Sequence, residues 1–147
     1  MSTQVPSHRI ESASREAVKR DSRPKRVLII DDEEHIANTL AAMLHNLGYE
    51  TAAVHDAISG LAHCENWVPD LIITDVVMPG MNGVEVGLVA RQLYPHCKIL
   101  LLSEVAGGSE FLKEARQNGY DFELVEKPLP LSALLARVAA LVQDDNS

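Results

Sequence analysis

The chain has 147 residues, 46% of them hydrophobic, which suffices for one domain with a proper core and is typical of a folded protein. Its formal net charge of −8 is unevenly spread, because residues 1–26 carry seven Lys or Arg and three Asp or Glu, whereas the remainder carries six and eighteen. An acidic body argues against DNA or RNA as a partner, since phosphates need a basic surface.

The cysteines and the hydrophobic runs indicate the compartment. Cys64 and Cys97 lie far apart and lack metal-ligand spacing, so we interpret both as reduced, small apolar residues. The N-terminus has no long apolar segment, and no run approaches the length that spans a membrane. We therefore expect a cytoplasmic protein without membrane contact.

Three segments follow one another along the chain. Residues 1–24 are rich in Ser, Arg and Glu and have too little apolar surface to hold a helix in place, so we expect a flexible extension. Residues 25–143 form the predicted domain, and 144–147 form a polar tail.

Within the domain, strand patterns alternate with helix patterns five times. The predicted strands are short runs at 26–30, 49–54, 71–74, 99–102 and 123–126. The predicted helices repeat apolar residues with a period near 3.6 and lie at 36–47, 56–64, 83–93, 110–118 and 131–141. This alternation predicts an α/β domain whose parallel sheet is covered by helices on both faces. The second strand is shorter and more polar, which favours an edge position.

Polar side chains stand where four of the predicted strands end. Asp31 and Asp32 follow the first strand, Asp75 the third, Ser103 the fourth and Lys127 the fifth. In a doubly wound sheet these ends converge on one crevice. Three neighbouring carboxylates would not all stay ionised without a cation, and their hard oxygen atoms suit Mg²⁺. A hydroxyl and an ammonium beside that metal indicate a site for a phosphoryl group.

The motifs at these positions resemble the receiver domains of two-component response regulators. They read Val-Leu-Ile-Ile-Asp-Asp-Glu at 27–33, Asp-Val-Val-Met-Pro-Gly-Met-Asn-Gly at 75–83, Ser103, and Lys-Pro at 127–128. The resemblance covers about residues 25–141. It implies a flavodoxin-like, doubly wound five-stranded parallel sheet with strand order 2-1-3-4-5 and five helices. Because no effector domain is visible, we expect a stand-alone response regulator.

The resemblance also implies a metal site. Asp32, Asp75 and the main-chain carbonyl of Val77 would ligate Mg²⁺ directly, and Asp31 would act mainly through a coordinated water.

The resemblance further implies that Asp75 accepts a phosphoryl group from a sensor histidine kinase or a phosphotransfer protein. Lys127 would neutralise charge on the transferring group, and Ser103 would turn to bind it, moving its loop and the fourth helix. The domain would catalyse only its own phosphorylation and dephosphorylation, and would signal to a downstream protein through its fourth helix, fifth strand and fifth helix.

Two positions depart from the usual receiver pattern. An aromatic residue normally stands three positions before the lysine, where this chain has Leu124, and a small residue normally follows the switch serine, where it has Glu104. Either Phe122 reaches the aromatic position through a bulge, or the switch runs on Ser103 and the fourth helix alone. The alternative function is a pseudo-receiver, a docking module that phosphate does not switch. A Mg²⁺-dependent phosphohydrolase is disfavoured, because its usual Asp-x-Asp motif after the first strand is missing.

Overall fold

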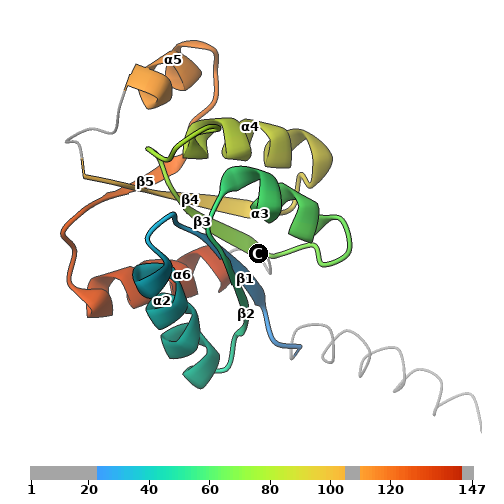
Figure 1. Cartoon of the computed structure of the whole chain (residues 1–147), viewed down its shortest axis with the longest axis vertical. Helices are drawn as coiled ribbons and strands as arrows, with labels where there is room; N and C mark the ends of the chain where they lie inside the picture. The colour runs from blue at the N-terminus through green and yellow to red at the C-terminus, as the bar shows by residue number, and fades with distance from the viewer. Residues whose placement is uncertain (1–22, 105–109, 144–147) are drawn as a thin grey trace, which may run out of the picture.

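A computed structural model describes residues 23–104 and 110–143 of the chain. Its sheet has five parallel strands in the order β2-β1-β3-β4-β5 (Figure 1). The strands are β1 (Arg26–Ile30), β2 (Glu50–Val54), β3 (Leu71–Asp75), β4 (Lys98–Ser103) and β5 (Glu123–Glu126). The helices are α2 (Glu34–Asn46), α3 (Ala57–Cys64), α4 (Gly83–Leu93), α5 (Glu110–Gln117) and α6 (Leu131–Gln143). The predicted fold class and strand order are confirmed, and β2 lies at an edge as expected. The predicted extension up to residue 22 and the tail at 144–147 lie outside the described residues.

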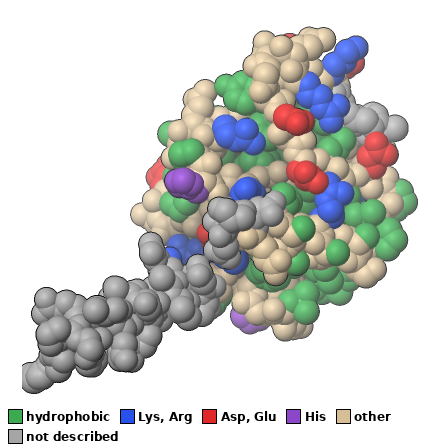
Figure 2. All heavy atoms as spheres, turned by 180° about the vertical axis from the view of Figure 1, so that it is seen from behind, with side chains coloured by type: hydrophobic (Ala, Val, Ile, Leu, Met, Phe, Trp, Pro, Cys, Tyr) green, Lys and Arg blue, Asp and Glu red, His purple; other side chains and the backbone are tan. Residues whose placement is uncertain are grey.

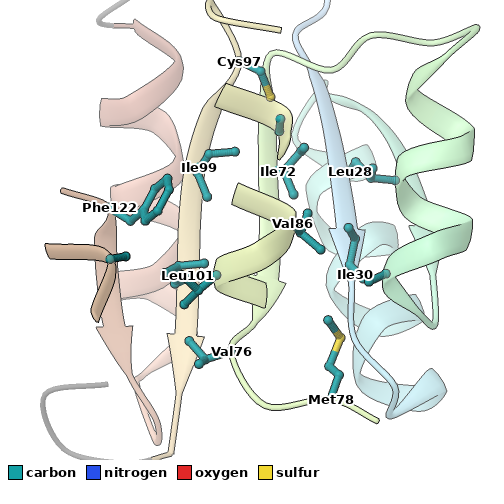
Figure 3. Close-up of a cluster of buried hydrophobic side chains, with 14 of the residues drawn as sticks. Leu28, Ile30, Ile72, Val76, Met78, Val86, Cys97, Ile99, Leu101 and Phe122 are labelled. Atoms are coloured by element: carbon teal, nitrogen blue, oxygen red, sulfur yellow. The ribbon is translucent and has the colours of Figure 1, made fainter. Parts of the chain in front are cut away.

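Two hydrophobic layers cover the two faces of the sheet. Because successive side chains of a strand point to opposite faces, Leu28 and Ile30 join one layer, whereas Val27 and Ile29 join the other. The first layer packs under α3, α4 and α5, and the second under α2 and α6. Figure 3 shows side chains of the first layer, among them Leu28, Ile72 and Leu101. The central strands β1, β3 and β4 are thus buried on both faces, which explains their continuous aliphatic runs.

Local signals fix where several helices begin and end. The Asp56 side chain accepts a hydrogen bond from the Ser59 amide and caps α3. Asn82 and Glu85 form a reciprocal capping box at the start of α4, with both hydrogen bonds at 2.9 Å. Gly48 follows α2 with a φ of 105°, a backbone conformation that favours glycine.

Three apolar residues that the helical periodicity would turn toward the core are exposed instead. Ile36 and Leu47 lie outside the buried stripe of α2, and Leu93 at the end of α4 is 61% exposed. The buried stripe of α2 is formed by Ala37, Leu40, Ala41 and Leu44. Helical periodicity indicates the direction of an apolar face but not its width.

Packing explains why a glycine, Gly87, stands in the middle of α4. A β-carbon at this position would lie 3.1 Å from two ring atoms of Phe122 and 3.4 Å from Ile99. Figure 3 shows Phe122 and Ile99 in the layer that α4 covers. The glycine therefore lets α4 pack closely on the Phe122 ring, despite its low helix propensity.

Candidate functional site

The predicted site residues meet at the edge of the sheet where the parallel strands end. Asp75 is the last residue of β3 and Ser103 the last of β4, while Asp31 directly follows β1 and Lys127 directly follows β5. The registers align these ends, because Ile30 pairs with Thr74 and Ser103 pairs with Glu126. This edge is where ligands bind in open α/β sheets.

A buried acidic pair faces the ammonium group of Lys127. The Lys127 Nζ atom lies 2.8 Å from Asp75 Oδ1 and 3.8 Å from Asp31 Oδ2. Asp31 is 2% exposed and Asp75 is 9% exposed. The other Asp31 oxygen, Oδ1, accepts a hydrogen bond from the Glu33 amide at 2.9 Å, which fixes the orientation of that carboxylate. One cation thus offsets two buried anions, and the site retains negative charge.

The pKa of Asp75 reflects this imbalance. It is raised from 3.8 to about 6, chiefly by burial and also by the nearby charge of Asp31, while the hydrogen bond from Lys127 opposes the rise. Burial by itself would lower the pKa of Lys127, but its bond to Asp75 and the surrounding carboxylates outweigh burial, so that pKa is raised. Lys127 therefore stays protonated. Any further positive charge at the site would stabilise the ionised form of Asp75.

Three carboxylates are arranged so that they fit a divalent cation. Asp31, Asp32 and Asp75 each offer an oxygen atom, and these three atoms lie within 4.8 Å of one another. Asp32 is exposed, which leaves one side of the group open to water. Mg²⁺ prefers hard oxygen ligands and keeps several waters, so the donor set and its partial exposure suit this ion.

The loop after β3 is held closely against the end of that strand. The Val76 amide donates to the Leu102 carbonyl at 2.9 Å, and the Gly83 amide donates to the Val76 carbonyl at 2.8 Å. Val77, the predicted main-chain ligand, lies between these anchors with its side chain 59% exposed. A β-carbon at Gly83 would come 1.9 Å from the Asp75 carbonyl oxygen. The sequence indicates Gly83 as a helix start and as the last residue of the motif at 75–83, but it does not predict this contact with the Asp75 main chain.

Comparison with known proteins identifies the family. The family model of the response regulator receiver domain matches residues 27–139. The chain belongs to the receiver domain family of response regulators. The receiver is 32% identical to the sensory transduction protein RegX3 of Mycolicibacterium smegmatis over 117 residues, covering 80% of this chain and 50% of RegX3. It is 29% identical to the DNA-binding response regulator MtrA of Mycobacterium tuberculosis over 120 residues, covering 82% of this chain and 51% of MtrA. The chain thus spans about half the length of these curated relatives.

Two solved structures with the same fold are also response regulators. The receiver is similar to a CheY-like response regulator receiver domain protein from Methanospirillum hungatei, with a TM-score of 0.75, 28% identity, and coverage of 84% of this chain and 97% of that one. It is similar to the chemotaxis response regulator CheY4 of Vibrio cholerae, with a TM-score of 0.69, 28% identity, and coverage of 80% and 98%. In the part of the receiver that the structure describes, no helix is long and apolar enough to cross a membrane.

Leu124, one of the two positions that depart from the receiver pattern, and the aromatic Phe122 lie in different surroundings. Leu124 lies within β5, opposite Leu101 of β4, in a continuous register from Glu123 to Glu126. Phe122 precedes β5 and is 3% exposed. Its ring stacks on Tyr120 and lies 4.9 Å from the Arg91 guanidinium carbon. Phe122 is therefore a core residue under α4, and no bulge in β5 moves it to the position of Leu124.

Ser103 lies where the ends of β4 and β5 meet. Ser103 is buried, and its carbonyl accepts a hydrogen bond from the Lys127 amide at 2.7 Å, which ties the ends of β4 and β5 together.

Cys64 and Cys97 are both buried and free of disulfides, as predicted. Burial raises the pKa of the Cys64 thiol to about 11, so this cysteine is an unreactive part of the core.

Proposed function

We propose that Asp75 is the phosphoacceptor of this receiver and that its donor is a phosphohistidine on a sensor histidine kinase or a phosphotransfer protein. The observation that carries the proposal is the Lys127 ammonium 2.8 Å from a buried Asp75 carboxylate, with Asp31 and Asp32 beside it. Family membership supports the same role, since the matched region contains all four residues.

In the proposed transfer, an Asp75 carboxylate oxygen forms a bond to phosphorus while the bond from phosphorus to the donor nitrogen breaks. The nitrogen keeps the bonding electron pair, and the product is an acyl phosphate on Asp75. Lys127 holds its proton, as its raised pKa requires, and offsets charge on the phosphoryl oxygens. Ser103 would donate its hydroxyl proton in a hydrogen bond to the bound phosphoryl group.

Asp31, Asp32, Asp75 and the Val77 carbonyl are the proposed Mg²⁺ ligands, with Asp31 acting through a water. When bound there, the ion would add positive charge for the incoming phosphoryl oxygens. The negative charge that Lys127 leaves uncompensated, and the raised pKa of Asp75, support a cation at this position.

We further propose that the domain catalyses only its own phosphorylation and dephosphorylation and signals through protein contact. Nucleic acid is disfavoured as a partner of the domain, because residues 27–147 carry eighteen acidic and six basic side chains. Figure 2 shows basic and acidic side chains interspersed on one face rather than a uniformly basic surface.

The second candidate is a pseudo-receiver that docks without being switched by phosphate. Leu124 favours it, because the usual aromatic side chain is missing from β5 and Phe122 does not replace it. The intact cluster of Asp31, Asp75 and Lys127 favours phosphorylation instead.

Intact mass measured after incubation with Mg²⁺ and acetyl phosphate separates the two candidates. A working receiver gains one phosphoryl group, needs Mg²⁺ for the gain, and loses it in Asp75→Ala. A folded wild-type protein that gains no mass would instead be a pseudo-receiver.

A further inference from the structure

Glu104 lies next to Lys127 at the candidate site. It directly follows Ser103, whose carbonyl accepts the Lys127 amide proton at 2.7 Å, so the main chain brings Glu104 next to Lys127. Its side chain is exposed, and it is not one of the three grouped carboxylates. A negative charge is therefore available beside the phosphoacceptor without being used as a metal ligand.

A cavity joins Glu104 and Lys127. It has a volume of about 760 Å³ and lies between α2 and α6, and its lining includes Glu33, Glu104 and Lys127 together with the apolar Ile36 and Leu131. The charge of Glu104 also acts on the ammonium, since it helps, with Asp75 and Asp31, to keep the pKa of Lys127 raised. Glu104 and an incoming phosphoryl group would thus compete for the same cation.

We propose that Glu104 determines which phosphodonors the receiver accepts, by disfavouring donors with a high negative charge. The proposal rests on the proposed function of Asp75. A carboxylate beside Lys127 repels a small dianion such as acetyl phosphate, and it weakens the attraction of Lys127 for that anion. A donor that carries a compensating positive charge near its phosphoryl group is repelled less.

An effect of the charge of Glu104 can be distinguished from an effect of its size by two substitutions. If charge matters, the isosteric Glu104→Gln removes the effect, and salt should weaken it because mobile ions screen an exposed carboxylate. If size matters, only Glu104→Ala makes room beside Lys127, and it does so equally for all small donors.

The test compares initial rates of Asp75 phosphorylation, followed by intact mass, with two donors. Acetyl phosphate is a dianion, and phosphoramidate has a smaller net negative charge because its nitrogen is protonated. Both donors transfer the same phosphoryl group, and in both cases phosphorus forms a bond to the Asp75 oxygen. The bond from phosphorus to acetate breaks in one donor, and the bond from phosphorus to nitrogen breaks in the other. The nitrogen leaves as neutral ammonia, because it already carries the proton. The matched control is Glu65→Gln, which removes one exposed negative charge just past α3, at the opposite edge of the sheet.

At low salt, Glu104→Gln should raise the acetyl phosphate rate roughly three- to tenfold and the phosphoramidate rate at most about twofold. The advantage should shrink at about 0.5 M salt, and Glu65→Gln should match the wild type. Equal rates for Glu104→Gln and wild type with both donors would overturn the proposal, as would an acceleration seen only in Glu104→Ala and equal for both donors. Failure of the proposed function is a different result, because no variant, wild type included, would then be phosphorylated by either donor.

Discussion

Gly83 packs directly against the main chain of Asp75, so that a β-carbon at Gly83 would lie 1.9 Å from the Asp75 carbonyl oxygen. No L side chain fits at that distance without moving the end of β3 or the start of α4. The start of α4 is itself fixed by the Asn82–Glu85 capping box and by the Gly83 amide bond to Val76. The position of the candidate phosphoacceptor therefore depends on a missing side chain eight residues further along the chain.

Gly83→Ala should lower the free energy of unfolding by roughly 2–4 kcal/mol and slow phosphorylation at Asp75, because the strand end must shift. Urea unfolding and intact mass with acetyl phosphate measure the two effects. Gly87→Ala is the matched control, since it is the same change in the same helix and its closest contacts are side-chain atoms of Phe122 and Ile99. It should change stability by no more than about 1 kcal/mol, because the gain in helix propensity opposes the crowding. Equal effects of the two substitutions would refute the role given to Gly83.

Asp75 should make stability depend on pH. Its pKa is about 6 in the folded protein against an ordinary value of 3.8, so the native state holds this proton more tightly than the unfolded state does. The resulting stabilisation is fully present below the ordinary value and is lost as pH rises through about 6. With EDTA present, wild type should lose about 1–3 kcal/mol more than Asp75→Asn between about pH 4 and about pH 7. Chemical unfolding across this range gives the comparison, and parallel profiles for the two proteins would contradict the assigned shift.

Mg²⁺ should stabilise the fold through the three grouped carboxylates. A ligand that binds only the native state adds about 2.7 kcal/mol at a concentration one hundred times its Kd, so the thermal midpoint should climb with added Mg²⁺. Asp32→Asn should reduce this climb but leave the midpoint in EDTA nearly unchanged, because Asp32 is exposed. Glu34→Gln makes a similar charge change at the start of α2, outside the group, and should keep the full response. A response that Glu34→Gln reduces as much as Asp32→Asn does would indicate general charge screening.

Phe122 should behave as a core residue. Phe122→Ala removes a ring that is 3% exposed and packs on α4, so it should cost about 3–5 kcal/mol in urea unfolding. Leu124→Ala, at a half-buried position of β5, should cost only about 1–2 kcal/mol. A smaller loss for Phe122→Ala than for Leu124→Ala would show that the ring is not held in the layer beneath α4.

The strand ends could be predicted from sequence because each combines an apolar run with an abrupt polar stop. Asp31, Asp75, Ser103 and Lys127 all stand at such stops, and the structure places them at one edge. Their proximity follows from parallel topology, which the strand–helix alternation indicates. Their roles in phosphoryl transfer remain predictions.

Contacts between distant segments could not be predicted in this way. The sequence of α4 shows that Gly87 is unusual, but only the structure shows the Phe122 ring beneath it. The sequence also allowed Phe122 either to reach the usual aromatic position through a bulge or to lie elsewhere. The unbroken register of β5 shows that there is no such bulge. The exposure of Ile36, Leu47 and Leu93 could not be predicted either. A helical pattern does not say how much of the apolar face the sheet covers.

The most direct test is to trap the phosphorylated residue chemically. Borohydride reduces an acyl phosphate of aspartate to homoserine, and cleavage after glutamate places Asp75 in fragment 66–85 and the pair Asp31 and Asp32 in another fragment. After phosphorylation with acetyl phosphate and Mg²⁺, we expect homoserine at position 75 and an unmodified fragment around Asp31. Homoserine at Asp31 or Asp32, with residue 75 unchanged, would contradict the assignment of Asp75 as the phosphoacceptor.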